Sequence, residues 1–515
     1  MTPCRRSLLL IHPPVAKPCE PPLGIARLAG ALHHHGADVR VYDANREGLF
    51  GLLNTPLSAS DTWTRRALSH RQGHMDALCS AAGYRHPDIY RRAVMDLNRI
   101  LAMAGKAAGV NLSFSNYTDN ALSPVRSRDL IQAAETFSAN PFFPFFSTDL
   151  SALFTAWTPD GVGLSINFMS QALCAFAIIG WVRKMLPRVR IICGGGLVTS
   201  WTRIPGLGNP FSGLVDELVG GPGETPLLSF CQGASNGNGS AAFPPADDDF
   251  TGLSPDHYLS PVPVLPVSAS RGCYWRKCAF CPETAEKTVY VPTAPDGVSR
   301  SVNHLARKTN AGLIHFLDNA LSPKLLAYLA DHPPQASWYG FSRITRHLAN
   351  PEFARRLKQA GCVMLKLGVE SGDQAVLDAM NKGAELETMQ AALRALHQAG
   401  IATYVYLLFG TPAEDESSAR KTLEFTLSQA PFIDFLNLAI FNLPAGSPAT
   451  ERLETGAFYE GDLSLYREFV HPKGWQRDQV RRFLSREFKK PAAIREILHR
   501  DPPYFTSNHA PFLMR

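Results

Sequence analysis

Three of the ten cysteines lie close together in the sequence and have the spacing of metal ligands. They are Cys273, Cys278 and Cys281, all within the segment Arg271–Cys281, which directly follows a short apolar run. Thiolates are the usual protein ligands of iron–sulfur clusters. These cysteines can therefore hold three irons of a 4Fe–4S cluster, and they are the candidate metal ligands and catalytic residues.

The segment has no fourth cysteine, so one iron of such a cluster would stay open. An open iron can chelate the amino and carboxylate groups of S-adenosylmethionine (SAM) and deliver an electron to its sulfonium. The competing interpretation is a structural zinc site, which needs a closed shell of four ligands such as three cysteines and a histidine. His257 and His304 are distant in sequence, so the spacing favours the cluster.

The bulk composition limits the classes of protein to consider. A chain of 515 residues is expected to form two or three domains. The net charge of +6 is spread along the sequence and does not favour a nucleic-acid partner. The apolar runs Leu8–Ile11 and Ala172–Trp181 are too short for a signal peptide or a membrane span, so we expect a cytoplasmic protein with reduced cysteines.

Apolar strands alternate with helices in the first half of the chain. This pattern predicts an α/β, doubly wound, Rossmann-like domain over residues 1–231 with a parallel sheet. A mostly helical insertion at about 46–158 interrupts it, and core packing is the preferred role of the insertion's aromatic residues. Residues 232–258 begin with a stretch rich in Gly, Ser and Asn and are predicted to be a linker. The expected strands are Ser7–Ile11, Val39–Tyr42, Val162–Ile166, Val189–Cys193 and Leu214–Val219.

A second alternation of strands and helices follows, over residues 259–445. Six strand–helix steps predict a partial (βα)6 barrel of the TIM type, in which chemistry lies in the loops after the strands. The cysteine segment follows the first of these strands. Residues 446–515 are expected to form a helical C-terminal tail. The expected strands are Val264–Ser268, Leu313–Leu317, Ser337–Phe341, Val363–Gly368, Thr403–Leu408 and Phe432–Ala439.

The cysteine segment and the predicted barrel, over about 262–445, resemble the radical SAM superfamily. The usual motif there is C-x3-C-x2-C, and here the first gap is one residue longer. The resemblance implies that short motifs after successive strands bind SAM, with Phe280 beside the adenine and Glu370 on the ribose or amino acid part. The SAM-binding residues implied in this way are Phe280, Asp318, Asn319, Glu370, Ser371, Gly410 and Pro412. Ser342 and Arg343 end the third strand, where a site residue and a surface arginine are equally compatible with the sequence.

The N-terminal half resembles the cobalamin (B12)-binding domain that precedes many radical SAM domains. Glycines after strands let the backbone approach a bulky ligand and its phosphate. The Asp-x-His-x-x-Gly signature that supplies a cobalt-ligating histidine is absent, and His12 lacks its context. The alternative is a plain Rossmann-like sheet. The implied cobalamin-binding residues are Ser165, Asn167, Gly194, Gly195, Gly196, Gly223 and Glu224.

The function implied by these resemblances is that of a cobalamin-dependent radical SAM enzyme, most simply a C-methyltransferase. A 5′-deoxyadenosyl radical would abstract a hydrogen from the substrate, which would then take a methyl group from methylcobalamin. An external electron donor of the flavodoxin or ferredoxin type is implied as the partner. A non-methylating rearrangement, cyclisation or sulfur insertion, and a non-catalytic cobalamin or cluster redox sensor, remain as alternatives. A peptide, a lipid or a small metabolite would suit the architecture as substrate.

Overall fold

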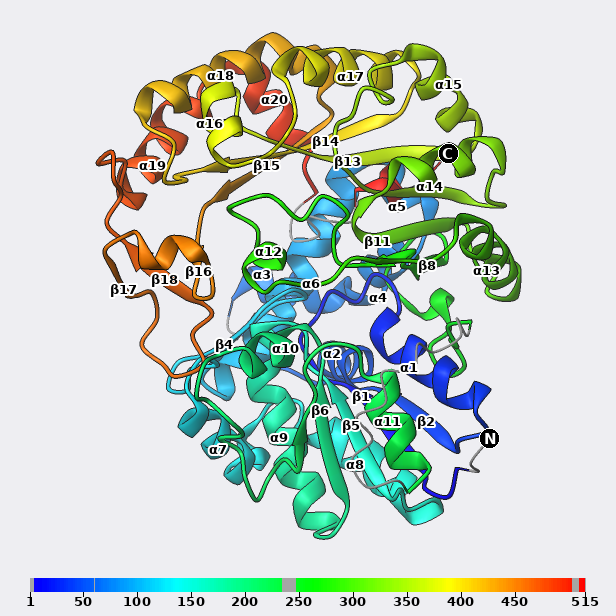
Figure 1. Cartoon of the computed structure of the whole chain (residues 1–515). Coiled ribbons are helices and arrows are strands. Elements are labelled where there is room, and N and C mark those ends of the chain that lie inside the picture. The colour runs from blue at the N-terminus through cyan, green and yellow to red at the C-terminus, as the bar shows by residue number, and fades with distance from the viewer. Residues whose placement is uncertain (1–3, 60, 234–246, 503–508, 515) are drawn as a thin grey trace. The chain divides into compact units, whose positions relative to one another are not determined.

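The structure is a computed structural model that describes residues 4–59, 61–233, 247–502 and 509–514. The chain divides into two compact units. The first comprises the described residues up to Pro263 together with Glu460–Ser464, and the second comprises most of the rest, beginning at Val264. Each unit is built around a parallel β-sheet of its own (Figure 1).

The sheet of the first unit has five parallel strands in the order β2-β1-β5-β6-β7. Strands β1 and β5 are buried along their whole length, because helices cover a parallel sheet on both faces. The described strands and main helices of this sheet are β1 (Leu8–His12), α1 (Leu23–His34), β2 (Val39–Asp43), β5 (Gly161–Ser165), α9 (Met169–Met185), β6 (Arg190–Gly194), α10 (Gly196–Thr202), β7 (Glu217–Leu218) and α11 (Glu224–Cys231).

The order of the strands fixes where this sheet can bind a ligand. Strand β2 pairs with one edge of β1, and β5, which comes later in the sequence, pairs with the other edge. The loops after β1 and β5 therefore leave the sheet in opposite directions and open a crevice at its carboxyl edge. The doubly wound fold and the parallel sheet predicted from the sequence are confirmed.

The insertion between β2 and β5 is mostly helical and carries one small hairpin, β3 (Val110–Leu112) with β4 (Tyr117–Asp119). Its aromatic residues pack inside the unit: Phe142 and Phe146 are 1% and 2% exposed. Its helices are α2 (Ala44–Asn54), α3 (Thr62–Ser69), α4 (Arg71–Leu78), α5 (Ala81–Arg85), α6 (Pro87–Ala107), α7 (Ser127–Glu135) and α8 (Phe143–Ala156).

Most of the Gly-rich stretch of the predicted linker, residues 234–246, lies outside the described residues. Residues 247–258 pack against α1: Asp249 N donates to Ala26 O over 2.9 Å, and Arg27 pairs with Asp248 over 3.1 Å. Tyr258 is buried and donates its hydroxyl to Asp43 over 2.6 Å.

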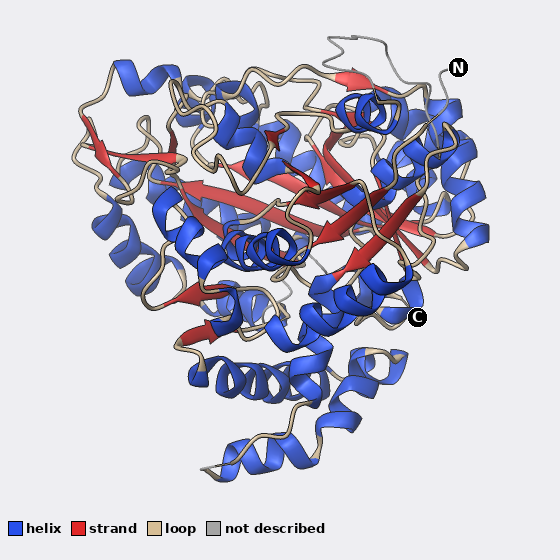
Figure 2. Ribbon diagram, turned by 90° about the horizontal axis from the view of Figure 1, so that it is seen from below, coloured by secondary structure: helices blue, strands red, loops and turns tan. Residues whose placement is uncertain are grey.

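The second unit contains six parallel strands in the order β15-β14-β13-β12-β11-β8. Neighbours in this sheet are also neighbours in the sequence of strand–helix steps, so the sheet winds in one direction as a partial barrel. Figure 2 shows the strands in red, with blue helices beside them. The elements are β8 (Val264–Val267), α13 (Pro295–Lys308), β11 (Leu313–Leu321), α14 (Pro323–Asp331), β12 (Ser337–Ser342), α15 (Pro351–Gln359), β13 (Cys362–Glu370), α16 (Gln374–Ala379), α17 (Leu386–Gln398), β14 (Ala402–Phe409), α18 (Glu416–Gln429) and β15 (Phe435–Ile440).

The tail contains more than the helices that the sequence predicts. Helices α19 (Arg477–Phe483) and α20 (Ala492–Arg500) are joined by a π-helical turn, Leu484–Phe488. A three-stranded antiparallel sheet precedes them, formed by β16 (Leu443–Pro444), β17 (Thr455–Ala457) and β18 (Tyr466–Phe469). These strands are only two to four residues long, too short to show a clear alternation in the sequence.

The described C-terminal residues pack on the barrel. His509 is fully buried, and its ring lies 4.2 Å from that of Tyr404 and 4.6 Å from that of Phe435. Among the described residues, no helix has both the length and the apolar character that a membrane span requires.

Candidate active site

The cysteine segment lies at the carboxyl end of β8, the first strand of the barrel. A short hairpin pairs β9 (Ser270–Arg271) with β10 (Val291–Pro292), and the three cysteines lie in the loop between these strands. A single-turn helix, α12 (Pro282–Ala285), begins directly after Cys281. The sequence places the cysteines after the first barrel strand, and the structure has them there.

The three thiols differ in burial. Cys278 is 9% exposed, whereas Cys273 and Cys281 are half-buried. Burial raises the pKa of Cys281 to about 11, and burial also raises the pKa of Cys278, opposed by the positive charges of Lys382 and Arg343. A free thiolate is therefore disfavoured in this loop, and a metal that binds thiolate would have to displace the protons.

The three sulfurs share one loop without forming a ready-made metal site. Within the described part of the chain, no three His, Cys, Asp or Glu side chains are gathered in a metal-binding arrangement. Neither a cluster site nor a closed zinc site is thus preassembled. The donor set itself suits a cluster, because it consists of soft thiolates supplied by one loop beside two cations.

Arg343, directly after β12, contacts this loop. Its Nη1 donates to the Cys278 sulfur over 3.5 Å, and its guanidinium lies 4.2 Å from the centre of the Trp275 ring. Its Nη2 donates to the backbone oxygen of Lys382. The side chain is 7% exposed, so Arg343 belongs to the site and is not a surface arginine.

Lys382 connects two of the predicted SAM-binding residues. Its Nζ lies 2.8 Å from Glu370 Oε1 and 5.6 Å from the centre of the Phe280 ring. The Lys382 and Glu370 side chains are 6% and 12% exposed, so this ion pair is largely shielded from solvent. Glu370 has a positive φ of 68°, a conformation that costs free energy in a residue other than glycine and that occurs at functional sites. The structure therefore brings Glu370, Phe280 and Cys278 around one lysine.

Asp318 and Asn319, near the end of β11, have different surroundings. Asp318 is 3% exposed and accepts hydrogen bonds from Ala269 N, over 2.9 Å, and from the Ser270 hydroxyl. It thereby connects the end of β11 to the entrance of the cysteine hairpin. Asn319 is exposed.

Ser371 and Gly410 directly follow β13 and β14. The Ser371 hydroxyl is fully buried, 3.2 Å from the Thr422 hydroxyl of α18, and it accepts from Asp373 N over 3.1 Å. Its contacts hold the turn after β13 against α18. Gly410 donates its N–H to the carboxylate of Glu414. Pro412, which lies between these two residues in the sequence, is half-buried.

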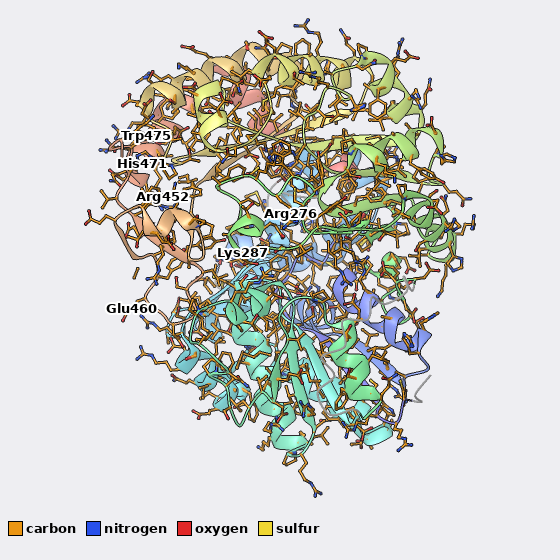
Figure 3. All side chains as sticks on the ribbon, viewed as in Figure 1. Arg276, Lys287, Arg452, Glu460, His471 and Trp475 are labelled. Carbon is orange, nitrogen blue, oxygen red and sulfur yellow. The ribbon has the colours of Figure 1, made fainter. Side chains whose placement is uncertain are left out.

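Glu414 connects the β14 loop to the tail. Its Oε2 also accepts from the Trp475 indole over 3.0 Å, and His471 Nε2 lies 2.8 Å from Thr411 O. His471 and Trp475 come from the tail, where Figure 3 labels them side by side. Glu414 is fully buried, and burial raises its pKa to about 7. A small cavity of about 40 Å³ beside Gly410 is also lined by Phe441, Trp475 and Arg477 of the same unit.

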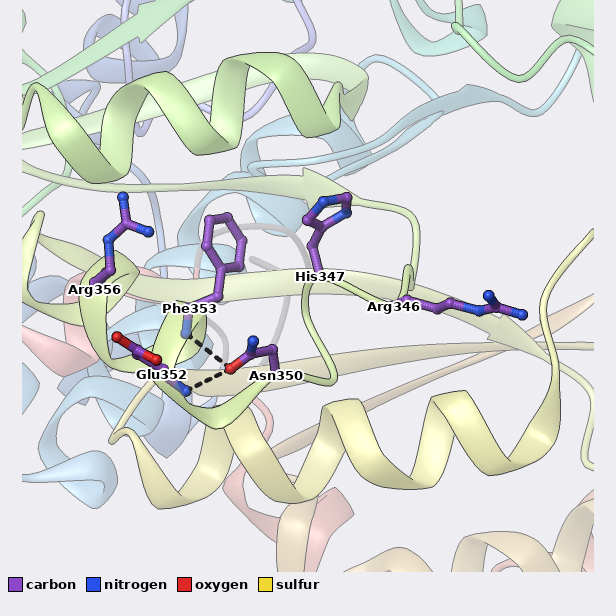
Figure 4. A pocket seen from close by; sticks show the side chains of 6 residues that line it. All are labelled: Arg346, His347, Asn350, Glu352, Phe353 and Arg356. Atoms are coloured by element: carbon purple, nitrogen blue, oxygen red, sulfur yellow. Dashed lines mark hydrogen bonds between the residues drawn. The ribbon is translucent and has the colours of Figure 1, made fainter.

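A larger and more open cavity, of about 380 Å³, lies elsewhere in the second unit, at the start of α15. The residues that line it include Arg346, His347 and Arg356, and Asn350 there accepts from the N–H groups of Glu352 and Phe353 (Figure 4). None of the residues predicted to bind the cluster or SAM lines this cavity.

The predicted cobalamin residues lie at the carboxyl edge of the first sheet. Asn167 Oδ1 accepts from Gly196 N over 2.9 Å, and its Nδ2 donates to the Ser165 hydroxyl over 3.2 Å. Gly195 has a φ of 102°, and a Cβ there would lie 2.5 Å from Ile166 O. The loops after β5 and β6 are thus tied together at the crevice.

The remaining predicted residues of this set start α11. A Cβ on Gly223 would lie 3.1 Å from Leu28 of α1, and Glu224 is 7% exposed. A Cβ on Gly24, at the start of α1, would lie 3.4 Å from the Ser165 hydroxyl. Helix α1 therefore lies between the two parts of the predicted set.

The sequence did not reveal the turn that receives the cysteine loop, residues 380–383. Met380 O accepts from Ala279 N, and Asn381 O accepts from the Trp275 indole, both over 2.9 Å. Lys382 and Trp275 were missed because a lysine after a helix and an aromatic residue in a loop are each common. Trp275, which lies between Cys273 and Cys278, was the one available signal.

Comparisons with known proteins find a matching family and several similar proteins. The family model of the Radical SAM superfamily matches residues 267–426. The bacteriochlorophyllide d C-12(1)-methyltransferase of Chlorobaculum tepidum is 26% identical over 233 residues, which are 43% of this chain and 48% of that protein. The anaerobic magnesium-protoporphyrin IX monomethyl ester cyclase of Cereibacter sphaeroides is 21% identical over 42% of this chain and 37% of that protein. The matches thus span less than half the length of these relatives.

The fold is similar to that of a solved methyltransferase over most of the chain. The radical S-adenosylmethionine methyltransferase TsrM from Kitasatospora setae superposes with a TM-score of 0.52 and 17% identity, over 86% of this chain and 75% of that one. A second structure of the same protein, with cobalamin and a [4Fe-4S] cluster bound, gives a TM-score of 0.51 over 87% of this chain. This likeness extends beyond the barrel and includes the Rossmann-like unit. Residues 267–426 of the chain thus match the Radical SAM superfamily, and the fold is similar to that of a radical SAM methyltransferase over most of the chain.

Proposed function

We propose that the chain is a cobalamin-dependent radical SAM enzyme that transfers a methyl group to a carbon atom of its substrate. The observation that carries the proposal is the assembly of Cys278, Arg343, Lys382 and Glu370 at the carboxyl edge of the barrel. The named methyltransferase relative and the likeness to TsrM support methylation as the outcome.

In this proposal Cys273, Cys278 and Cys281 hold the 4Fe–4S cluster and leave one iron for SAM. Glu370 and Phe280 are close to Lys382, which itself acts on Cys278, so they are placed to contact a SAM molecule bound at that iron. Gly410 and Pro412 would line its adenine side. Asp318 and Ser371, whose polar groups are engaged within the protein, would act by holding the loops that carry these contacts.

The crevice of the first unit is the proposed cobalamin site. Ser165, Asn167 and the glycines 194–196 provide backbone without bulky side chains at the carboxyl edge, where doubly wound sheets bind cofactors. Gly223 and Glu224 extend the site at the start of α11. His12, at the end of β1, is 6% exposed, and burial lowers its pKa, so it is a neutral imidazole near this edge.

When bound, the cluster supplies the electron that cleaves SAM to a 5′-deoxyadenosyl radical, and the cobalamin carries the methyl group that the substrate takes up. The protein's part is to orient the groups and to exclude water from them. The electron would come from an external carrier of the flavodoxin or ferredoxin type. A labile cluster and cysteines that form no disulfide among the described residues suit a reducing compartment, so the cytoplasm is the proposed location. We propose that residues 1–231 bind cobalamin, that 259–445 form the radical SAM core and that 446–515 form the tail. Residues 232–258 connect the first two parts, and their second half, 247–258, packs on α1.

The proposal is tested by anaerobic reconstitution with iron, sulfide, cobalamin, a reductant and SAM carrying a labelled methyl group. The wild-type chain should bind iron and sulfide in equal amounts and form 5′-deoxyadenosine. Cys278→Ala should lose both, whereas Cys362→Ala, which changes a buried cysteine outside the loop, should keep both. Zinc in place of iron in the wild-type chain would overturn the assignment of the cysteines.

A second candidate is a radical SAM reaction that transfers no methyl group, because the second named relative is a cyclase. Both relatives' names specify tetrapyrrole substrates, so a chlorin and a porphyrin are the first substrates to assay. Methylation predicts labelled methyl in the product. Substrate conversion with 5′-deoxyadenosine but without label would favour the cyclase type.

A further inference from the structure

Arg343 holds three separate parts of the second unit together. One guanidinium nitrogen donates to the Cys278 sulfur over 3.5 Å, and the other donates to the backbone oxygen of Lys382. Its planar face lies 4.2 Å from the Trp275 ring centre, the arrangement of a cation–π contact. With 7% exposure, this charge is almost completely removed from solvent.

The residues that Arg343 joins also fit closely to one another. The cysteine loop is bound to the turn at 380–383 through Ala279 N and the Trp275 indole. Gly383 lies against Trp275 so closely that a Cβ would be 2.0 Å from the ring. Because Arg343 comes from the loop after a different strand, it fixes the position of Cys278 relative to β12.

The charges around Cys278 single out Arg343 among its neighbours. Lys382 is paired with Glu370 over 2.8 Å, so its charge is largely balanced. The hydrogen bonds of Arg343 to Cys278 and Lys382 reach a sulfur and a carbonyl oxygen, neither of which carries a full negative charge while Cys278 is a neutral thiol. Its positive charge is therefore available to a thiolate at Cys278.

We propose that Arg343 is a positioning residue that raises the reduction potential of the cluster through its hydrogen bond to the Cys278 sulfur. The inference rests on the proposed function, in which Cys278 is a cluster ligand. Reduction adds one electron to the cluster, and the low-potential carrier that gives it up is oxidised. A buried cation that donates to a ligand sulfur stabilises the more negative, reduced state.

The test is redox titration of the reconstituted chain, followed by the electron paramagnetic resonance signal of the reduced cluster. Arg343→Gln removes the charge and should shift the midpoint potential to more negative values. Arg343→Lys keeps the charge, so its midpoint potential should lie closer to that of the wild-type chain. The matched control is Arg346→Gln, which removes the same charge from an exposed residue of the same loop and should leave the potential unchanged.

The outcomes separate this inference from the proposed function. A wild-type chain without a 4Fe–4S cluster would overturn the proposed function. A wild-type cluster whose potential is the same in Arg343→Gln and Arg346→Gln would overturn the inference alone. If Arg343→Gln binds no iron, hydrogen exchange of residues 273–281 in the metal-free variant decides the question. Exchange equal to that of the metal-free wild-type chain would show that Arg343 does not position the cysteine loop and would overturn the inference.

Discussion

Among single residues, Glu414 has the clearest pH-dependent contribution to stability. It is fully buried, accepts from the Trp475 indole, and has a pKa raised to about 7 by burial. In the unfolded chain an exposed glutamate ionises near its ordinary value, whereas in the folded chain it holds its proton until about neutral pH. The stabilisation is therefore complete below the unfolded pKa and is lost as pH rises through the folded pKa.

We predict that Glu414→Gln flattens the pH dependence of the free energy of unfolding. The amide oxygen can still accept both hydrogen bonds, but it does not ionise, so a difference of about 3 kcal/mol between about pH 5 and pH 8 should be lost. Urea unfolding followed by circular dichroism at both pH values measures it. The control is Glu416→Gln, an exposed residue paired with Arg420. An equal slope in wild type and Glu414→Gln would contradict the assigned protonation.

Between elements, the close approach of Gly383 to Trp275 fixes the cysteine loop on the turn after α16. Gly383→Ala places a Cβ 2.0 Å from the indole and should displace the loop, so the variant should retain much less iron after reconstitution. Gly400→Ala is the matched control. Gly400 also has a positive φ (75°, against 62°), but a Cβ there would lie 3.8 Å from Lys358 Cε, an ordinary van der Waals distance. Both variants bear a backbone cost of about 1 kcal/mol, so only the contact with the ring differs. Equal iron content in both would show that the loop does not depend on this contact.

The crevice of the first sheet permits the same kind of comparison. In Gly195→Ala the Cβ would lie 2.5 Å from Ile166 O, which should push the loops after β5 and β6 apart. Gly221→Ala has a similar φ, 83° against 102°, and meets nothing within 4 Å. We predict that Gly195→Ala weakens cobalamin binding about tenfold or more, a loss of at least about 1.4 kcal/mol, while Gly221→Ala does not. Spectrophotometric titration with cobalamin measures both, and similar affinities would place the ligand elsewhere.

For the whole molecule, the division into two units with separate sheets predicts separable cofactor binding. Cys278→Ser should abolish 5′-deoxyadenosine formation, because the cluster loses a ligand, yet leave the cobalamin affinity of the first unit unchanged. Gly195→Ala should weaken cobalamin binding by the first unit and should still form 5′-deoxyadenosine in the absence of substrate. Loss of cobalamin binding in Cys278→Ser would show that the two sites are energetically coupled.

Both sheets could be predicted from the sequence because buried parallel strands are continuous apolar runs. Strand β1 contains little else, and the two prolines that follow it, Pro13 and Pro14, are equally visible. The short strands β16 to β18 were missed, since two to four residues leave no period to detect. The packing of residues 247–258 on α1 was hidden by the linker-like composition just before it.

The sequence by itself determined the cysteine spacing, the order of strands and helices, and the position of the cysteine loop after a barrel strand. All of these are properties of neighbouring residues. Only the tertiary structure decided that Arg343 is buried on Cys278, that Lys382 joins Glu370 to Phe280, and that the tail reaches Glu414 through Trp475. These contacts join residues between 12 and 102 positions apart along the chain, and local patterns carry no information about such pairs because packing of the whole unit selects them.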